Sequence, residues 1–212
     1  MGIVLAESVK DLPFIETINL SDNNLTDKSL CKIINSIITI ATLTDLDLSE
    51  NIIDGQAALA LAKFLGSSYC KLQRLIMKSA NIDDDECPMF VVALKKNQSL
   101  KELDMSCNLL GVSENLNSVK PALITGSEAL ADLLESNTCL VASLHLSWNM
   151  IRLDGAVTFA TSIGVNAFLT HLDVSYNSLG EAGGEALGKA LFTNKTLKTL
   201  FLDHNGLLHL FA

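Results

Sequence analysis

One pattern of apolar residues with an asparagine near its end recurs seven times and covers almost the whole chain. It reads Leu-x-x-Leu-x-Leu-x-x-Asn-x-Leu, and its clearest copy is Leu43, Leu46, Leu48, Asn51 and Ile53. The asparagine position falls at residues 23, 51, 80, 108, 149, 177 and 205, in steps of 28, 29, 28, 41, 28 and 28. A nearly constant period of this length predicts a solenoid of similar stacked units.

Each unit has room for one strand and one helix. The Leu-x-Leu core alternates with a period of two, as a half-buried strand does. Ala57, Leu61 and Leu65 then recur every four residues, which places them on one helical face. Parallel strands stack about 4.8 Å apart, whereas packed helices need roughly 8–10 Å, so the stack must bend. The predicted fold is α/β: a right-handed horseshoe with parallel strands on the concave face and helices on the convex face.

The frame also predicts where each strand lies and what the asparagines do. We expect seven strands, all parallel in one sheet, over residues 17–20, 45–48, 74–77, 102–105, 143–146, 171–174 and 199–202. Stacked asparagine side chains can bond backbone groups of the neighbouring turns, at about 1 kcal/mol net for each bond. Ala80 breaks the asparagine column, and Asn81 is one residue out of register.

These seven aligned repeats, over about residues 12–207, resemble the ribonuclease-inhibitor-like leucine-rich repeats. The resemblance implies the horseshoe fold. It leaves the function open, because that class includes ribonuclease inhibitors, Ran-GTPase-activating proteins, sensor domains of nucleotide-binding receptors, and cytoskeletal or ciliary proteins. Fold alone does not choose among them.

Charge and cysteine content narrow the class of partner and the compartment. The net charge of −9 argues against a nucleic-acid backbone or an anionic membrane and favours a protein partner with a basic patch. No apolar run approaches the 18 residues or so that a membrane span needs. The five cysteines are scattered and form no C-x-x-C pair. This usage predicts a reduced, cytoplasmic protein.

The repeat predicts a single domain over residues 1–212. Residues 1–12 read as the helix half of a preceding repeat or an N-terminal cap, and about seven repeats follow over 13–212. The step of 41 residues implies an insertion at about 111–125, either a functional loop or a tolerated one. Neither end shows a polar cap, which favours a segment of a larger protein and self-association through the ends. The alternative is an isolated protein whose first helix caps one end.

Residues that flank and follow the strand leucines are expected on the concave face. Trp148, Tyr176 and His204 share one column there, beside His145, Asp173 and Phe201. Tryptophan and tyrosine dominate binding hot spots, so this column is a candidate anchor for a partner. The alternative is that the rings fold over the turn and pack locally. Asp47 and Asp104 lie in an acidic N-terminal part of the same face, where they would attract a basic partner.

The sequence predicts no catalytic, cofactor or metal site. Its four histidines lie in different columns without carboxylate or cysteine at ligand spacing. His145, Ser147 and Asp173 occupy an open face with no oxyanion donor, and a phosphate-binding glycine loop is absent. The predicted function is a non-enzymatic scaffold that binds a protein on its concave face. The alternatives are a GTPase activator that acts through the repeat edge and the 111–125 loop, the sensor arm of a nucleotide-binding receptor, and a ciliary or cytoskeletal subunit.

Overall fold

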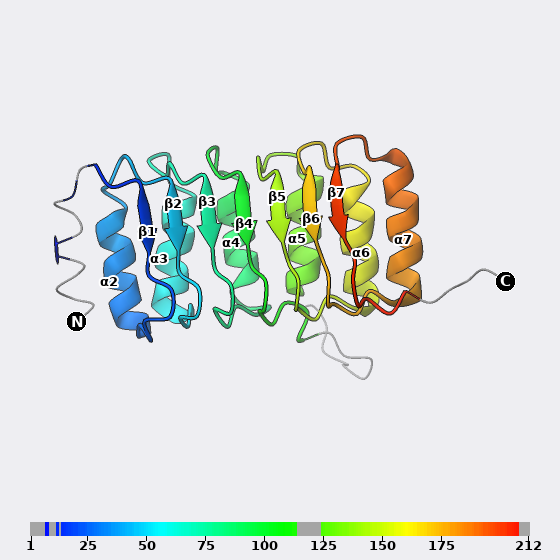
Figure 1. The fold of residues 1–212 in the computed structure, drawn as a ribbon, viewed down its shortest axis with the longest axis horizontal. Helices are drawn as coiled ribbons and strands as arrows, with labels where there is room; N and C mark the ends of the chain where they lie inside the picture. Colours follow the sequence, from blue (N-terminus) through cyan, green and yellow to red (C-terminus); the bar gives the residue numbers. More distant parts are fainter. Residues whose placement is uncertain (1–6, 9–11, 13, 114–123, 208–212) are drawn as a thin grey trace.

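Strands and helices alternate along the chain in a single row of repeats (Figure 1). The computed structural model describes residues 7–8, 12, 14–113 and 124–207. The elements, in chain order, are β1 (Thr17–Asn19), α2 (Asp27–Ile37), β2 (Asp45–Asp47), α3 (Gly55–Leu65), β3 (Arg74–Ile76), α4 (Cys87–Leu94), β4 (Glu102–Asp104), α5 (Gly126–Glu135), β5 (Ser143–His145), α6 (Leu153–Ile163), β6 (His171–Asp173), α7 (Gly180–Thr193) and β7 (Thr199–Phe201).

The seven strands form one parallel sheet in the order of the sequence, from β1 to β7. The middle residue of each strand pairs with the middle residue of the next, as Leu46 does with Leu75 and Leu75 with Leu103. The repeat frame is therefore confirmed, including the helix that resumes after the insertion at Gly126. The helices all lie on one side of the sheet and spread more widely than the strands (Figure 1), which leaves the sheet on the inner side.

The hydrophobic core fills the layer between the sheet and the helices. The middle strand residues point into it and are almost fully buried from Leu46 to Leu172. Helical positions such as Leu61, Phe90 and Phe159 meet them from the other side. Each repeat contributes the same few apolar positions, so the core runs without interruption along the solenoid.

The asparagine column forms a hydrogen-bonded ladder between neighbouring turns. Asn51 is buried, and its Nδ2 donates to the carbonyl of Leu20 in the preceding repeat at 2.9 Å. Its Oδ1 accepts the N–H of Leu25 at 3.0 Å. Asn108, Asn149 and Asn177 form the corresponding bonds in their repeats. The role predicted for this column is thus present in the structure.

Ala80 interrupts the ladder because its side chain can neither donate nor accept a hydrogen bond. The Ala80 backbone carbonyl replaces the missing acceptor. The N–H of Ile53, which would have reached an amide oxygen at position 80, donates to the Ala80 carbonyl at 2.9 Å. Asn81 is exposed, with φ at 60°, and does not replace the missing side chain. The gap is tolerated because the buried N–H still has an acceptor.

Asp84 holds both ends of the insertion. Its Oδ1 accepts the N–H groups of Gly111 and Gly126, each at 2.6 Å, and its Oδ2 accepts the N–H of Ser113 at 2.8 Å. Gly111 has φ at +89°, and a Cβ there would lie 2.3 Å from the Met150 carbonyl oxygen, so only glycine fits. The loop therefore leaves and rejoins the solenoid at one fixed point.

Parts of the predicted domain organisation lie outside the described residues. These are most of the half-repeat at 1–12 and the middle of the insertion, residues 114–123. At the other end, Leu200 and Leu202 of the seventh repeat are only partly buried, whereas the matching Leu172 and Val174 are fully buried. None of the described helices combines the length and the apolar character that crossing a membrane requires.

Candidate partner-binding surface

The outward side of the sheet displays two columns of side chains, one on each side of the buried strand leucine. The first column runs Thr17, Asp45, Arg74, Glu102, Ser143, His171 and Thr199, and the second runs Asn19, Asp47, Ile76, Asp104, His145, Asp173 and Phe201. Parallel pairing in strict register sets each residue beside its counterpart in the next repeat. Neighbouring side chains in a column therefore lie side by side, and Asn19 Nδ2 donates to Asp47 Oδ2 at 3.2 Å.

Trp148, Tyr176 and His204 form a continuous stack of three rings, here called the aromatic stack. The Trp148 and Tyr176 ring centroids are 4.2 Å apart with 8° between the ring planes. Those of Tyr176 and His204 are 4.3 Å apart with 9° between the planes. The residues lie in the turn just after β5, β6 and β7, so the spacing of the strands sets the spacing of the rings.

The backbone holds the three rings at a common angle. All three residues have φ between 54° and 58°, in the left-handed region that bulky residues rarely adopt. Asp22, Glu50, Ser79 and Cys107 hold the same position in the first four repeats and have φ from 52° to 57°. The positive φ at this position is thus common to all seven repeats, and only the side chain differs from one repeat to the next.

Most of what Tyr176 exposes is the edge of its ring. Trp148 covers one face and His204 covers the other, yet the residue remains 36% exposed. Trp148 is the ring nearest the N-terminal repeats and is 57% exposed. Within the described residues neither the indole N–H nor the tyrosine hydroxyl forms a hydrogen bond. The stack therefore offers apolar ring edges together with unused polar groups.

A second aromatic group lies beside the stack on the sheet itself. The rings of His145 and His171 are 4.9 Å apart, and those of His171 and Phe201 are 5.4 Å apart, all tilted. His145 Nε2 also lies 3.0 Å from the Ser143 hydroxyl. The structure thus brings the predicted His145 and Phe201 together through His171, a residue not predicted as part of the surface. The first outward column, just before each strand leucine, would have revealed it.

The predicted carboxylates are partly used by the fold. Asp104 Oδ1 accepts the N–H and the hydroxyl of Ser106, at 2.8 and 2.6 Å. Asp47 forms both bonds with the serine two residues on, at 3.0 and 2.6 Å, and Asp173 accepts the corresponding N–H at 2.9 Å. Each is half-buried. These side chains close the turn after their strand, and among the described residues Oδ2 of Asp104 accepts no hydrogen bond.

The rest of the acidic part carries mixed charge. Arg74 and Glu102, on neighbouring strands, form an ion pair at 3.0 Å between Nε and Oε1. Asp22 and Glu50 are exposed in the turn column, and Lys78 stands in the next repeat. The acidic character of this half therefore depends on the turn column as much as on the strands.

Burial shifts the pKa of three described groups that lie away from the sheet face. Burial, followed by a hydrogen bond with Asp83, raises the pKa of Glu86 to about 7. Burial also raises the pKa of the Cys87 and Cys139 thiols, which opposes thiolate formation. Across the described part of the chain, no three histidine, cysteine or carboxylate side chains converge in a way that could hold a metal ion.

Comparisons with known proteins agree with this architecture. A family model described as "Leucine Rich repeat" matches residues 11–33, 39–62, 96–112 and 165–188. The chain is 31% identical over 166 residues to "NACHT, LRR and PYD domains-containing protein 12" of Mus musculus, which covers 78% of this chain and 15% of that protein.

Two further relatives match most of the chain. It is 28% identical over 190 residues to "Capping protein, Arp2/3 and myosin-I linker protein 3" of Rattus norvegicus, covering 89% of this chain and 13% of that protein. It is 28% identical over 194 residues to the ribonuclease inhibitor of Sus scrofa, covering 91% and 40%. The chain thus spans less than half the length of each of these relatives.

Proposed function

Because the chain belongs to the ribonuclease-inhibitor-like leucine-rich-repeat family, we propose that it is a non-enzymatic scaffold that binds another protein on its exposed sheet face. The observation that carries the proposal is the aromatic stack. Three rings stand in van der Waals contact at the surface, and their polar groups form no hydrogen bond with any residue that the structure describes. Aromatic residues that are rigid before binding lose little entropy when they bury area against a partner.

The geometry of the stack defines what it contacts. A cation binds over the face of an aromatic ring, and both faces of Tyr176 are covered by its neighbours. The exposed ring edge is the electropositive part of the ring. It therefore suits apolar side chains and hydrogen-bond acceptors such as carbonyl oxygens. His145, Asp173 and Phe201 border this contact on the sheet.

The acidic part of the face has a different role. A basic patch on the partner would meet Asp22, Glu50 and the remaining oxygen of Asp104, while the stack takes its apolar anchor. Charges at exposed positions act mainly on the rate of association, and buried aromatic contacts on dissociation. The net charge of −9 favours the same class of partner. The cytoplasm, where the five cysteines stay reduced, is the compartment we propose.

Photo-crosslinking tests the proposal with a control that the chain itself provides. p-Benzoylphenylalanine replaces Tyr176 in one variant and Tyr69, the other tyrosine, in a second. Tyr69 is 76% exposed. It lies in the loop between α3 and β3, before the strand begins, whereas the stack lies in the turns after the strands end. We expect a specific crosslinked partner only from position 176, and its loss when Trp148 is replaced by alanine. Equal crosslinking from both positions would count against the proposal.

The alternatives are tested separately. The relative named as a linker of capping protein, Arp2/3 and myosin-I favours a cytoskeletal role as the second candidate, and direct binding to each of those three components tests it. The NACHT-containing relative is the matching observation for a receptor sensor arm. A GTPase activator would instead accelerate GTP hydrolysis by a small GTPase and depend on the 111–125 loop.

A further inference from the structure

A groove of about 440 Å³ opens on the helical side of the solenoid, between α3 and α4 and away from the sheet face. Ala62 and Ala93 line it from the two helices, and both are nearly buried. Their short side chains leave space between the helices that larger residues would fill. Leu59 and Val92 stand beside this space and are 46% and 59% exposed.

Exposed apolar residues also occur on α7, where Leu191 and Phe192 are 40% and 88% exposed, but Leu59 and Val92 border a groove between two helices. Farther along the same outer face, α5 displays Asp132 and Glu135, both exposed. On α7 an exposed ion pair joins Lys189 and Glu185 at 2.7 Å. Charged residues of this kind are what a solvated outer face usually carries. The exposed leucine and valine between α3 and α4 depart from it.

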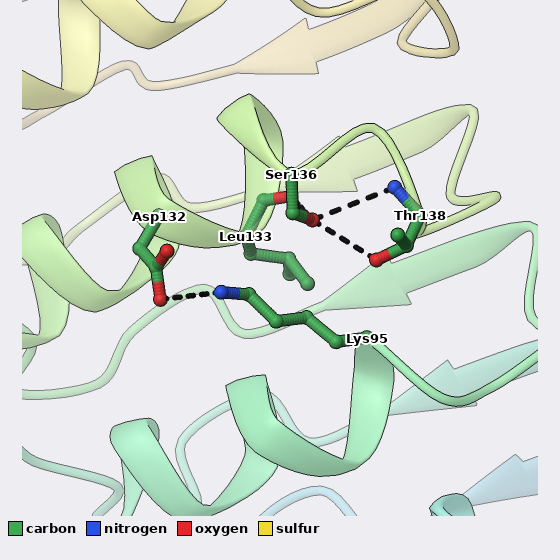
Figure 2. A network of polar contacts seen from close by, with 5 residues as sticks. All are labelled: Lys95, Asp132, Leu133, Ser136 and Thr138. Carbon is green, nitrogen blue, oxygen red and sulfur yellow. Dashed lines mark hydrogen bonds and ion pairs between the residues drawn. The ribbon is translucent and has the colours of Figure 1, made fainter.

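Two lysines stand at one end of the groove without a counter-ion. Lys63 lies in the last turn of α3 and Lys96 just after α4, and both line the groove. Within the described residues neither forms an ion pair. The adjacent Lys95 does, with Asp132 at 2.6 Å, and Figure 2 shows it reaching toward α5 instead. The groove therefore combines an apolar floor with uncompensated positive charge, in a chain whose net charge is −9.

We propose that this groove binds an acidic amphipathic helix from a partner protein. A third helix packs well along two helices that lie side by side, with its apolar side chains in the space between them. Leucines one turn apart on the partner would rest against Leu59, Met89 and Val92. Glutamates at one end of the same helix would pair with Lys63 and Lys96. The site is separate from the aromatic stack and does not depend on it.

Lys63 and Lys96 also lie where a positive charge can act within the fold, close to helix C-termini. A positive charge near a helix C-terminus interacts favourably with the helix dipole. That role would act on stability alone, whereas the proposal requires an effect on binding. The two are separated by measuring both quantities on the same variants.

Binding of defined synthetic helical peptides to the full 212-residue chain tests the proposal, by fluorescence anisotropy of a label on the peptide. One peptide carries leucines at i, i+4 and i+7 with glutamates on the flanking positions. A second has lysine in place of every glutamate. Val92→Glu is matched by Val165→Glu, because the two valines are 59% and 60% exposed and Val165 lies beyond α6, outside the groove. Oleate serves as a third probe, since it also joins an apolar chain to a carboxylate.

We expect the glutamate peptide to bind, and Val92→Glu to weaken it about tenfold or more while Val165→Glu leaves it unchanged. Lys63→Glu with Lys96→Glu should reverse the preference toward the lysine peptide. Tyr176→Ala should change nothing, so failure here is distinct from failure at the stack. The proposal is overturned if the glutamate peptide does not bind at millimolar concentration, if Val92→Glu and Val165→Glu behave alike, if both peptides bind equally, or if oleate alone binds.

Discussion

The acidic and the aromatic halves of the sheet face are built on the same repeat. They differ in how many of their side-chain groups are already hydrogen-bonded within the fold. In the acidic half Asp47 and Asp104 close their own turns through the serines that follow. In the aromatic half the Trp148 and Tyr176 rings stack on each other, and among the described residues their indole N–H and hydroxyl form no hydrogen bond. The strand carboxylates Asp47 and Asp104 therefore use part of their bonding within the fold, whereas the rings of the turn column remain available to bind.

The largest effect should come from truncating the aromatic stack. Trp148→Ala or Tyr176→Ala should weaken an identified complex by about 2 kcal/mol, roughly 30-fold, mainly through faster dissociation. Thermal stability should change little for Trp148→Ala, because that side chain is 57% exposed, and more for Tyr176→Ala, because neighbouring rings cover both faces of Tyr176. Surface plasmon resonance with Tyr69→Ala as control measures the rates. Tyr176→Phe, which keeps the ring and removes the hydroxyl, should lose less than Tyr176→Ala; the reverse order would show that ring packing is not the anchor.

The next effect concerns the carboxylates and separates charge from turn closure. Asp104→Ala should lower stability by about 1–2 kcal/mol, since the N–H and hydroxyl of the buried Ser106 lose their acceptor. Asp104→Asn keeps an oxygen in place and should unfold at nearly the same urea concentration. If charge steers the partner, the asparagine variant should still slow association and reduce its salt dependence. An unchanged association rate would limit Asp104 to its structural role.

The next prediction concerns self-association through the seventh repeat, where Leu200 and Leu202 are less buried than the matching residues of the sixth repeat. Phe192 is 88% exposed and Leu207 is 40% exposed. We expect concentration-dependent association of a few-fold in apparent mass, reduced by Phe192→Lys or by an appended polar capping repeat. Analytical ultracentrifugation over a concentration series is the measurement. A wild-type chain that stays monomeric throughout would rule the contact out.

The smallest effect involves Glu86, which belongs to neither half. Its pKa is about 7 in the folded chain, above its ordinary 4.5, because burial disfavours the charge. Folding therefore takes up a proton between these pH values, and stability contributed by the protonated group is lost as pH rises from about 4.5 to 7. Glu86→Gln should raise the free energy of unfolding at pH 8 by about 1 kcal/mol or less after solvent screening, and should leave it unchanged at pH 4. Urea unfolding at the two pH values measures the difference. An equal gain at both pH values would exclude ionisation as the cause.

The comparison also shows which parts of the molecule a sequence can predict. The period gave the strand positions and their parallel register, because the strand leucines must all enter one core. The same frame placed Trp148 and Tyr176 in one column. It did not reveal that Asp47 and Asp104 bond within their turns, since the sequence does not show which oxygen a carboxylate uses. The frame places His171 in the column before the strand leucine, but it does not show that this ring contacts His145 and Phe201, which lie in the other column.

Other features depend on how whole elements pack and carry no local signal. The Asp84 contacts join residues 27 and 42 positions apart in the chain. The groove between α3 and α4 needs two small residues, Ala62 and Ala93, to face each other across a helix contact. Each alanine alone is an ordinary helix former. The groove forms only because the packing of α3 against α4 places the two alanines opposite each other.

The Asp84 contacts have a consequence for how this chain can change. One carboxylate holds the backbone on both sides of residues 114–123, so the strands before and after are positioned independently of what lies between. Lengthening that segment should cost only loop-closure entropy, about 0.6 kcal/mol for each doubling. New sequence can therefore be inserted between residues 113 and 124, by evolution or by design, without disturbing the repeats.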